Sequence, residues 1–235
     1  MDTIIFDVDD TLYDQALPFK NACEKIITRT LSEQEVAQLY IASRKHSDAL
    51  FDKWQSGQLA TADMHTYRIT AACQDLHIEI TEQQAIDFQE AYVTGQKSIT
   101  LFGEVKQLLD LLSNQGKQLA VLTNGEPEHQ SMKIRQLGLT NWIAAENLFI
   151  SGAVGHAKPS IEVFSYIENK LGLDKSKTVY IGDSFENDVV GAKQAGWYSI
   201  WMNHRNREAL EGTRIKADRI VYSAKELLGE FLNPR

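Results

Sequence analysis

The sequence predicts an α/β fold, in which an open, doubly wound and mainly parallel sheet carries an all-helical domain inserted after its first strand. Short apolar runs that end in polar residues or glycine fit buried strands, at residues 4–6, 118–123, 147–151, 178–182, 198–202 and 219–222. Amphipathic stretches such as 103–117 and 161–173 lie between these runs, and strands that alternate with helices favour a parallel sheet. Residues 16–97 break the alternation, because they contain no strand-like run.

The sequence pattern of the insert predicts a set of helices. Its amphipathic stretches lie near residues 17–30, 33–55, 61–76 and 81–95. Ser32 with Glu35, and Thr81 with Gln84, have the spacing of a capping box, in which each side chain satisfies a free backbone N–H at the start of a helix. The predicted domains are a Rossmann-like core, at residues 1–15 and 98–235, and a helical domain, at residues 16–97.

Composition and charge limit the classes of partner. The 235 residues include 32 acidic and 24 basic ones, a formal net charge of -8, which weighs against a nucleic-acid or anionic-membrane surface. Cys23 and Cys73 lack the spacing of a metal site, so we interpret them as reduced, partly buried thiols. With neither a signal peptide nor an apolar run of membrane-spanning length, we expect a cytoplasmic protein. The expected oligomeric state is a monomer or a homodimer, and the expected partner is a small metabolite.

Polar residues gather where the predicted strands end. In open α/β sheets, ligands bind outside the carboxyl ends of the strands. The residues expected at that edge come from four separate segments: Asp7, Asp9 and Thr11; Thr123, Asn124 and Gly125; Lys158; and Asp183 with Asp188.

This group of residues suits a metal ion and a phosphate. Alternate residues of an extended segment point to the same side, so Asp7 and Asp9 should face together while Asp10 points elsewhere. Asp183 adds a carboxylate, and acids around one point favour a hard cation such as Mg²⁺. Lys158 would offset the charge of a carboxylate and of a phosphoryl oxygen.

The second segment fits the phosphate oxygens. The hydroxyl of Thr123 and the amides of Asn124 and Gly125 lie at a predicted turn from strand to helix. A helix N-terminus is a ready anion site, so these donors should bind the same oxygens as Lys158.

Four short motifs carry a family resemblance. DVDDT at residue 7, TN at 123, KP at 158 and GDSFEND at 182–188 resemble, in this order, the four signature motifs of the haloacid dehalogenase superfamily. The resemblance implies that Asp7 is the nucleophile, that Asp9 is the general acid and base, and that Thr123 and Lys158 position the phosphate. It also implies Mg²⁺ held by Asp7, the Asp9 backbone carbonyl and Asp183, with Asp188 supporting the metal's waters or Lys158.

The resemblance also suggests a function for the insert and a reaction. The helical domain occupies the place of a cap, which closes over small substrates, and the expected activity is a Mg²⁺-dependent phosphatase. The helical cap and WMNHRNRE at 201–208 are similar to bacterial pyrimidine nucleotidases, so a nucleoside 5′-monophosphate is a candidate substrate. Three alternatives stay open: a sugar phosphomutase, a 2-haloacid dehalogenase and a non-catalytic phosphate-binding regulator.

Other residues that could carry chemistry receive a structural interpretation. The six histidines lack metal-site spacing, and the basic cluster HRNR at 204–207 is typical of a solvated loop. The aromatic residues of the insert could line a substrate cavity, but we interpret most of them as helix-packing residues: Phe51, Trp54, Tyr67 and Tyr92.

Overall fold

The computed structural model describes residues 1–232, and only the backbone of residues 52 and 55. The chain divides into two compact units. The first combines Met1–Asp14 with Thr100–Arg235, and the second is Gln15–Ile99.

The first unit is built on a parallel sheet. Its strands within the described residues are β1 (Thr3–Phe6), β2 (Gln118–Thr123), β3 (Leu148–Ile150), β4 (Thr178–Gly182), β5 (Tyr198–Met202) and β6 (Arg219–Val221). They pair in the order β3-β2-β1-β4-β5-β6, and every pair is parallel. This is the strand order of a doubly wound Rossmann-like sheet, so the predicted fold class is confirmed.

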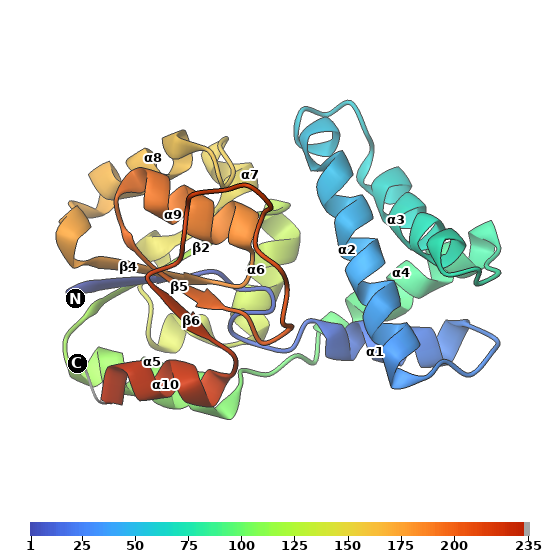
Figure 1. Ribbon diagram of the computed structural model, residues 1–235, viewed down its shortest axis with the longest axis horizontal. Coiled ribbons are helices and arrows are strands. Elements are labelled where there is room, and N and C mark those ends of the chain that lie inside the picture. Colours follow the sequence, from blue (N-terminus) through green and yellow to red (C-terminus); the bar gives the residue numbers. More distant parts are fainter. Residues whose placement is uncertain (233–235) are drawn as a thin grey trace. The chain divides into compact units, whose positions relative to one another are not determined.

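Helices cover both faces of this sheet. The α-helices are α5 (Gly103–Asn114), α6 (Pro127–Gln136), α7 (Ser151–Val154), α8 (Ile161–Leu171), α9 (Val190–Ala195) and α10 (Ala224–Leu232). The shorter elements are 3-10 turns at Leu139–Asn141, Ala145–Asn147 and Lys175–Lys177 and a π-helical turn at Phe185–Val189. Figure 1 shows α8 and α9 over one face, and α5 with α10 over the other. The order reverses between β1 and β4, which is where such sheets bind ligands.

Aromatic side chains fill the core beneath α8 and α9. The rings of Phe164 and Trp197 meet edge to face at 5.2 Å, and Tyr180 of β4 packs against Phe164 at 5.7 Å. Gly191 of α9 lies directly on Phe164, where an added Cβ atom would be 2.4 Å from Cε2. The close approach of α9 to α8 therefore depends on a residue without a side chain.

The secondary-structure elements described in the second unit are helices, as the sequence predicts. Within residues 15–99 the helices are α1 (Ala16–Ile26), α2 (Glu33–Gln55), α3 (Thr61–Asp75) and α4 (Glu82–Gln96). The first ends at Ile26 instead of near residue 30, because the backbone becomes extended at Ile27. Both predicted capping boxes are present: Thr81 with Gln84, and Ser32 with Glu35.

Phe19 lies at the centre of the helical unit. Its ring meets Tyr40, Phe88 and Tyr92 edge to face at 5.3, 5.0 and 5.8 Å. Tyr92 is thus a packing residue, as predicted, whereas Tyr67 is 51% exposed.

Cys23 and Cys73 lie in the same apolar cluster as free, buried thiols. Their burial agrees with the expectation of unreacted cysteines.

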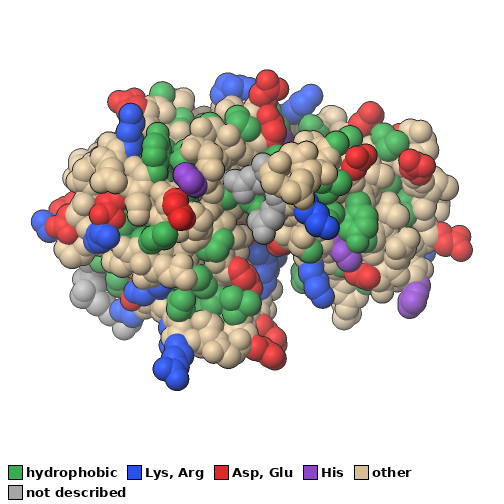
Figure 2. Space-filling model, turned by 90° about the horizontal axis from the view of Figure 1, so that it is seen from above, with side chains coloured by type: hydrophobic (Ala, Val, Ile, Leu, Met, Phe, Trp, Pro, Cys, Tyr) green, Lys and Arg blue, Asp and Glu red, His purple; other side chains and the backbone are tan. Residues whose placement is uncertain are grey.

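Acidic and basic side chains are interspersed on the face drawn in Figure 2. None of the helices in the described part of the chain combines the length and the apolar character that a membrane span needs.

A glycine exchange tests the packing of α9 on α8. Gly191→Ala should lower the free energy of unfolding by about 1–3 kcal/mol, because the new methyl group forces Phe164 to move within a filled core. Gly229→Ala in α10 is the matched control, since nothing lies within 4 Å of its Cβ position. We expect the control to be neutral or stabilising by up to about 1 kcal/mol. Urea denaturation followed by circular dichroism measures both, and equal stabilities of the two variants would contradict the packing argument.

Candidate active site

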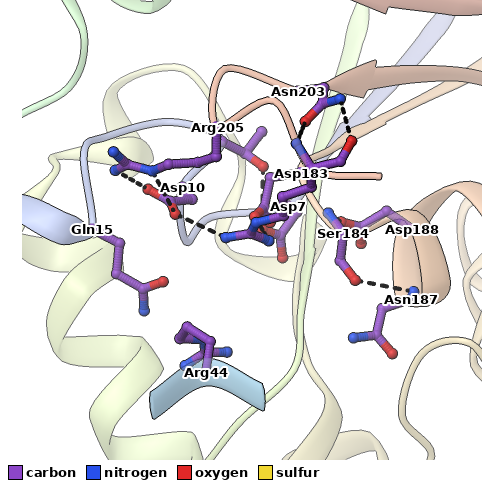
Figure 3. A network of polar contacts seen from close by, with 12 residues as sticks. Asp7, Asp10, Gln15, Arg44, Asp183, Ser184, Asn187, Asp188, Asn203 and Arg205 are labelled. Carbon is purple, nitrogen blue, oxygen red and sulfur yellow. Dashed lines mark hydrogen bonds and ion pairs between the residues drawn. The ribbon is translucent and has the colours of Figure 1, made fainter. Parts of the chain in front are cut away.

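Three carboxylates meet where the strand order reverses. Asp7 follows β1, Asp183 follows β4, and Asp188 lies in the π-helical turn after β4. One carboxylate oxygen from each side chain lies within 4.8 Å of the others (Figure 3). The Asp7 N–H donates to the Ile181 carbonyl at 2.8 Å, so the strand ladder itself fixes the position of Asp7 beside β4.

Lys158 lies among these acids. Its Nζ atom donates to Asp7 Oδ1 at 2.7 Å, to Asp188 Oδ1 at 2.6 Å and to the Tyr180 hydroxyl at 2.9 Å. Burial alone would lower the pKa of Lys158, but Asp188 and Asp7 raise it above its usual value. The lysine is therefore a fixed positive charge shared by two buried carboxylates.

Asp7 and Asp183 both have raised pKa values, so their charged forms are disfavoured. Burial raises the pKa of Asp7 to about 7, and Asp188 adds to the rise while Lys158 opposes it. Burial likewise raises the pKa of Asp183 well above its usual value, although Arg207 opposes the rise. A divalent cation beside them would favour the charged forms and lower both pKa values.

The donor set fits magnesium. Mg²⁺ prefers oxygen ligands and is usually held by one or two carboxylates with several waters, and the structure gathers buried carboxylate oxygens at one point. Asp7 and Asp183 would hold the ion. The Asp9 backbone carbonyl stays a predicted ligand, and Asp188 contacts Lys158 and the Ser184 N–H, at 2.6 and 2.8 Å.

Gly182 allows Asp188 to reach this position. A Cβ atom on Gly182 would lie 2.3 Å from the Asp188 carboxyl carbon. The glycine of the GD pair is thus required by the close return of the π-helical turn onto the end of β4.

Asp9 has a different environment from Asp7. Lys133 of α6 donates to both carboxylate oxygens of Asp9 at 2.7 Å, and Gln130 donates to Oδ2 at 3.0 Å. The Tyr13 hydroxyl donates to Oδ1. Burial would raise the pKa of Asp9, but Lys133 holds it below its usual range.

The TN segment joins two parts of the site. The Asn124 side chain accepts from the Lys158 N–H and donates to the Lys158 carbonyl, both at 2.9 Å. It therefore fixes the backbone that carries the lysine. Thr123 is buried at the end of β2, the position from which the sequence predicts a phosphate contact.

The amide of Gly125 and the start of α6 differ from the expected anion site. The Gly125 N–H donates to Ser151 Oγ at 3.0 Å. The carboxylate of Glu126 accepts from the N–H groups of Glu128 and His129 at 3.0 and 2.7 Å, so the chain caps its own helix. The predicted Gly125 donor is thus bonded to Ser151, and the acidic N-cap occupies two further N–H groups at the start of α6.

The basic loop at 204–207 is not the solvated loop that the sequence predicts. Arg205 donates to Asp10 at 2.8 Å, and Arg207 bridges Asp183 at 2.7 Å and Asp10 at 3.3 Å. Asp10 is 1% exposed and faces away from the Asp7 cluster toward this loop (Figure 3). The prediction failed because a buried aspartate needs cationic partners, and the loop after β5 supplies them.

Sequence reasoning missed Lys133, Gln130, Arg205, Arg207 and Tyr180 as partners of the predicted acids. One available signal was the position of Gln130 and Lys133 on α6, where both side chains lie three residues apart on the buried face with Ile134. A lysine on the apolar side of a helix is rare without a partner.

Comparison with known proteins identifies the family of the chain. A profile described as haloacid dehalogenase-like hydrolase matches residues 1–196. The chain belongs to this family. It is 27% identical to the pyrimidine 5′-nucleotidase YjjG of Escherichia coli (strain K12), over 90% of this chain and 90% of that protein. It is 28% identical to the pyrimidine 5′-nucleotidase PynA of Streptococcus pneumoniae, over 96% of this chain and 92% of that protein.

The solved structure of another protein has the same fold as this haloacid dehalogenase-like hydrolase. The HAD-hydrolase YfnB from Bacillus subtilis, described as bound to magnesium, superposes with a TM-score of 0.72 at 22% identity. The superposition covers 98% of each chain.

Replacing Lys158 tests its place among the acids. Lys158→Met should lower the free energy of unfolding in metal-free buffer by about 3–5 kcal/mol, because it leaves Asp7 and Asp188 buried without their shared cation. Lys193→Met is the matched control, since Lys193 pairs with Asp218 at 2.7 Å with side chains 30% and 28% exposed. The control should lose about 1 kcal/mol or less. Similar losses in the two variants, measured by urea denaturation, would show that the Lys158 contacts are not the strong ones.

Proposed function

We propose that this hydrolase is a Mg²⁺-dependent phosphatase that cleaves a small phosphomonoester through an aspartyl-phosphate intermediate. The observation that carries the proposal is the cluster of Asp7, Asp183, Asp188 and Lys158 at the switch point of the sheet. A nucleophilic carboxylate, a fixed cation and oxygen ligands for a metal lie within one small volume. Phosphoryl transfer through an aspartyl phosphate uses these three components.

In the first step, a carboxylate oxygen of Asp7 forms a bond to phosphorus while the bond from phosphorus to the substrate alcohol breaks. Asp9, which must be protonated at this step, gives its proton to the departing oxygen. In the second step, water attacks the phosphorus of the aspartyl phosphate, its proton passes to Asp9, and the bond to the Asp7 oxygen breaks to release inorganic phosphate. Each residue ends in its starting state.

The attack joins two negative groups, so the surrounding charge must favour it. Lys158, held 2.7 Å from Asp7, offsets charge on the nucleophile and on a phosphoryl oxygen. Thr123 would donate to another phosphoryl oxygen from the end of β2. A bound magnesium ion would supply further positive charge at the transferring group.

The alternatives use this set of residues less completely. Displacement of halide from carbon needs no protonation of the leaving group. Asp9, two residues after Asp7, would therefore have no role in that reaction. A phosphomutase would share these residues but return phosphate to a sugar. A non-catalytic regulator is expected to lack one of the charged groups, whereas Asp7, Asp9, Lys158 and Asp183 are all present.

A finer proposal concerns the leaving group. We propose that it is a nucleoside, because two pyrimidine 5′-nucleotidases align with 90% and 96% of this chain. These alignments include the helical unit, which we assign the part of a cap that selects the leaving group.

Turnover of p-nitrophenyl phosphate tests the reaction class. The purified protein should release p-nitrophenol with Mg²⁺ and lose this activity in EDTA. Asp7→Asn should reduce kcat by at least about 10³-fold, since it removes the nucleophile. Asp110→Asn, a surface carboxylate that accepts from Trp142, is the control and should leave kcat unchanged. A wild-type protein without metal-dependent release would refute the phosphatase proposal.

A substrate panel tests the finer proposal. We expect kcat/KM for uridine or deoxyuridine 5′-monophosphate to exceed that for ribose 5-phosphate and phosphoglycolate by about tenfold or more, because base contacts contribute to transition-state binding. Phosphate release is the measured quantity. A preference for a sugar phosphate would contradict the nucleotidase assignment, and isomerised sugar phosphate without free phosphate would identify a mutase.

A further inference from the structure

Lys133 is a buried cation beside the predicted active site. It lies on α6, is 2% exposed, and contacts both oxygens of Asp9. A lysine loses favourable hydration and side-chain entropy when it is buried in this way. The stability of the helix alone therefore does not explain why Lys133 is buried, even though it is paired with Asp9.

The contacts around Asp9 fix the orientation of its carboxylate. Lys133 holds both oxygens, Gln130 adds a bond to Oδ2, and Tyr13 adds one to Oδ1. Donors that reach both oxygens from α6 and from the segment after β1 restrict rotation about the side-chain bonds. Proton transfer requires such restriction, because the acid must lie within hydrogen-bond reach of the leaving oxygen.

The exposure of the pair is unequal. The Asp9 side chain keeps 17% of its surface exposed, whereas the Lys133 side chain keeps 2%. The lysine approaches the carboxylate from the interior and leaves another side of it open to solvent. The ion pair between Lys193 and Asp218 has comparable distances, but both of its partners are about equally exposed.

We propose that Lys133 is a positioning residue for the reaction, which orients Asp9 for proton exchange with the leaving alcohol and with water. The inference rests on the proposed phosphatase function. Lys133 acts through Asp9 and does not itself contact the reacting atoms. Gln130 assists it by holding the same carboxylate and the Asn124 carbonyl, which ties α6 to the end of β2.

A double-mutant cycle tests this dependence. The four proteins are the wild type, Lys133→Met, Asp9→Asn and the double variant, assayed with Mg²⁺ on the best nucleoside or sugar phosphate of the substrate panel. Lys133→Met should lower kcat about tenfold or more with KM within about threefold, since acid and base catalysis contributes about 10²–10⁴-fold. In the Asp9→Asn background the same exchange should change kcat by less than about twofold.

The leaving group provides a second readout. p-Nitrophenolate departs without protonation, so Lys133→Met should reduce kcat on p-nitrophenyl phosphate by a smaller factor than on the nucleoside or sugar phosphate, whose alcohol leaves with a proton. Lys193→Met is the matched control, and it should leave the ratio of the two kcat values unchanged. Thermal melting monitors the fold. If Lys133→Met does not fold, Gln130→Leu takes its place in the cycle with a smaller expected loss.

Each result has a defined meaning. Equal losses from Lys133→Met in both backgrounds, equal losses on both substrates, or a rise in kcat would overturn the positioning role. A wild-type protein without metal-dependent phosphate release would instead refute the proposed function. The wild-type assay therefore separates failure of the function from failure of the inference.

Discussion

The site depends on one arrangement, a buried lysine that stands between aspartates which would otherwise repel one another. Asp7 and Asp188 both bind Lys158, and the neighbouring elements serve this contact. Asn124 clamps the backbone of the lysine, Tyr180 accepts from its ammonium group, and Gly182 lets the turn that carries Asp188 approach. The sheet supplies the position of each partner, because Asp7, Tyr180 and Gly182 belong to or follow the neighbouring strands β1 and β4.

Charge is balanced differently on the two sides of the nucleophile. On one side, Asp7, Asp183 and Asp188 share Lys158 and Arg207, and Arg207 is also bonded to Asp10. Burial raises the pKa of Asp7 to about 7, and the charge of Asp188 adds to the rise while Lys158 opposes it. On the other side, Asp9 has Lys133 and neutral donors, and its pKa is lowered. Environments that separate pKa values in this way are typical of carboxylates with different roles. The excess of acids lies where a divalent ion would bind.

The parts of the fold that local patterns determine were predictable. The apolar runs gave the strands, and the polar residues at their ends gave the position of the site, because a parallel sheet brings the carboxyl ends of its strands to one edge. Both capping boxes formed because their contacts join residues three positions apart. The early end of α1 at Ile26 was not predictable from periodicity, since the apolar spacing continues past the residue at which the backbone turns extended.

The cations around the acids were harder to predict, because their pairing depends on tertiary structure. Lys133 lies 124 positions from Asp9, and Arg205 lies 195 positions from Asp10. No local spacing connects such residues, and a basic loop looks solvated until the acid that it covers is known to be buried. Charge balance supplies the missing constraint, because a buried carboxylate needs a cation beside it. A lysine on the apolar face of an amphipathic helix is rare without such a partner. Sequence patterns located the acids of this site, and electrostatic balance identifies the basic residues that must accompany them.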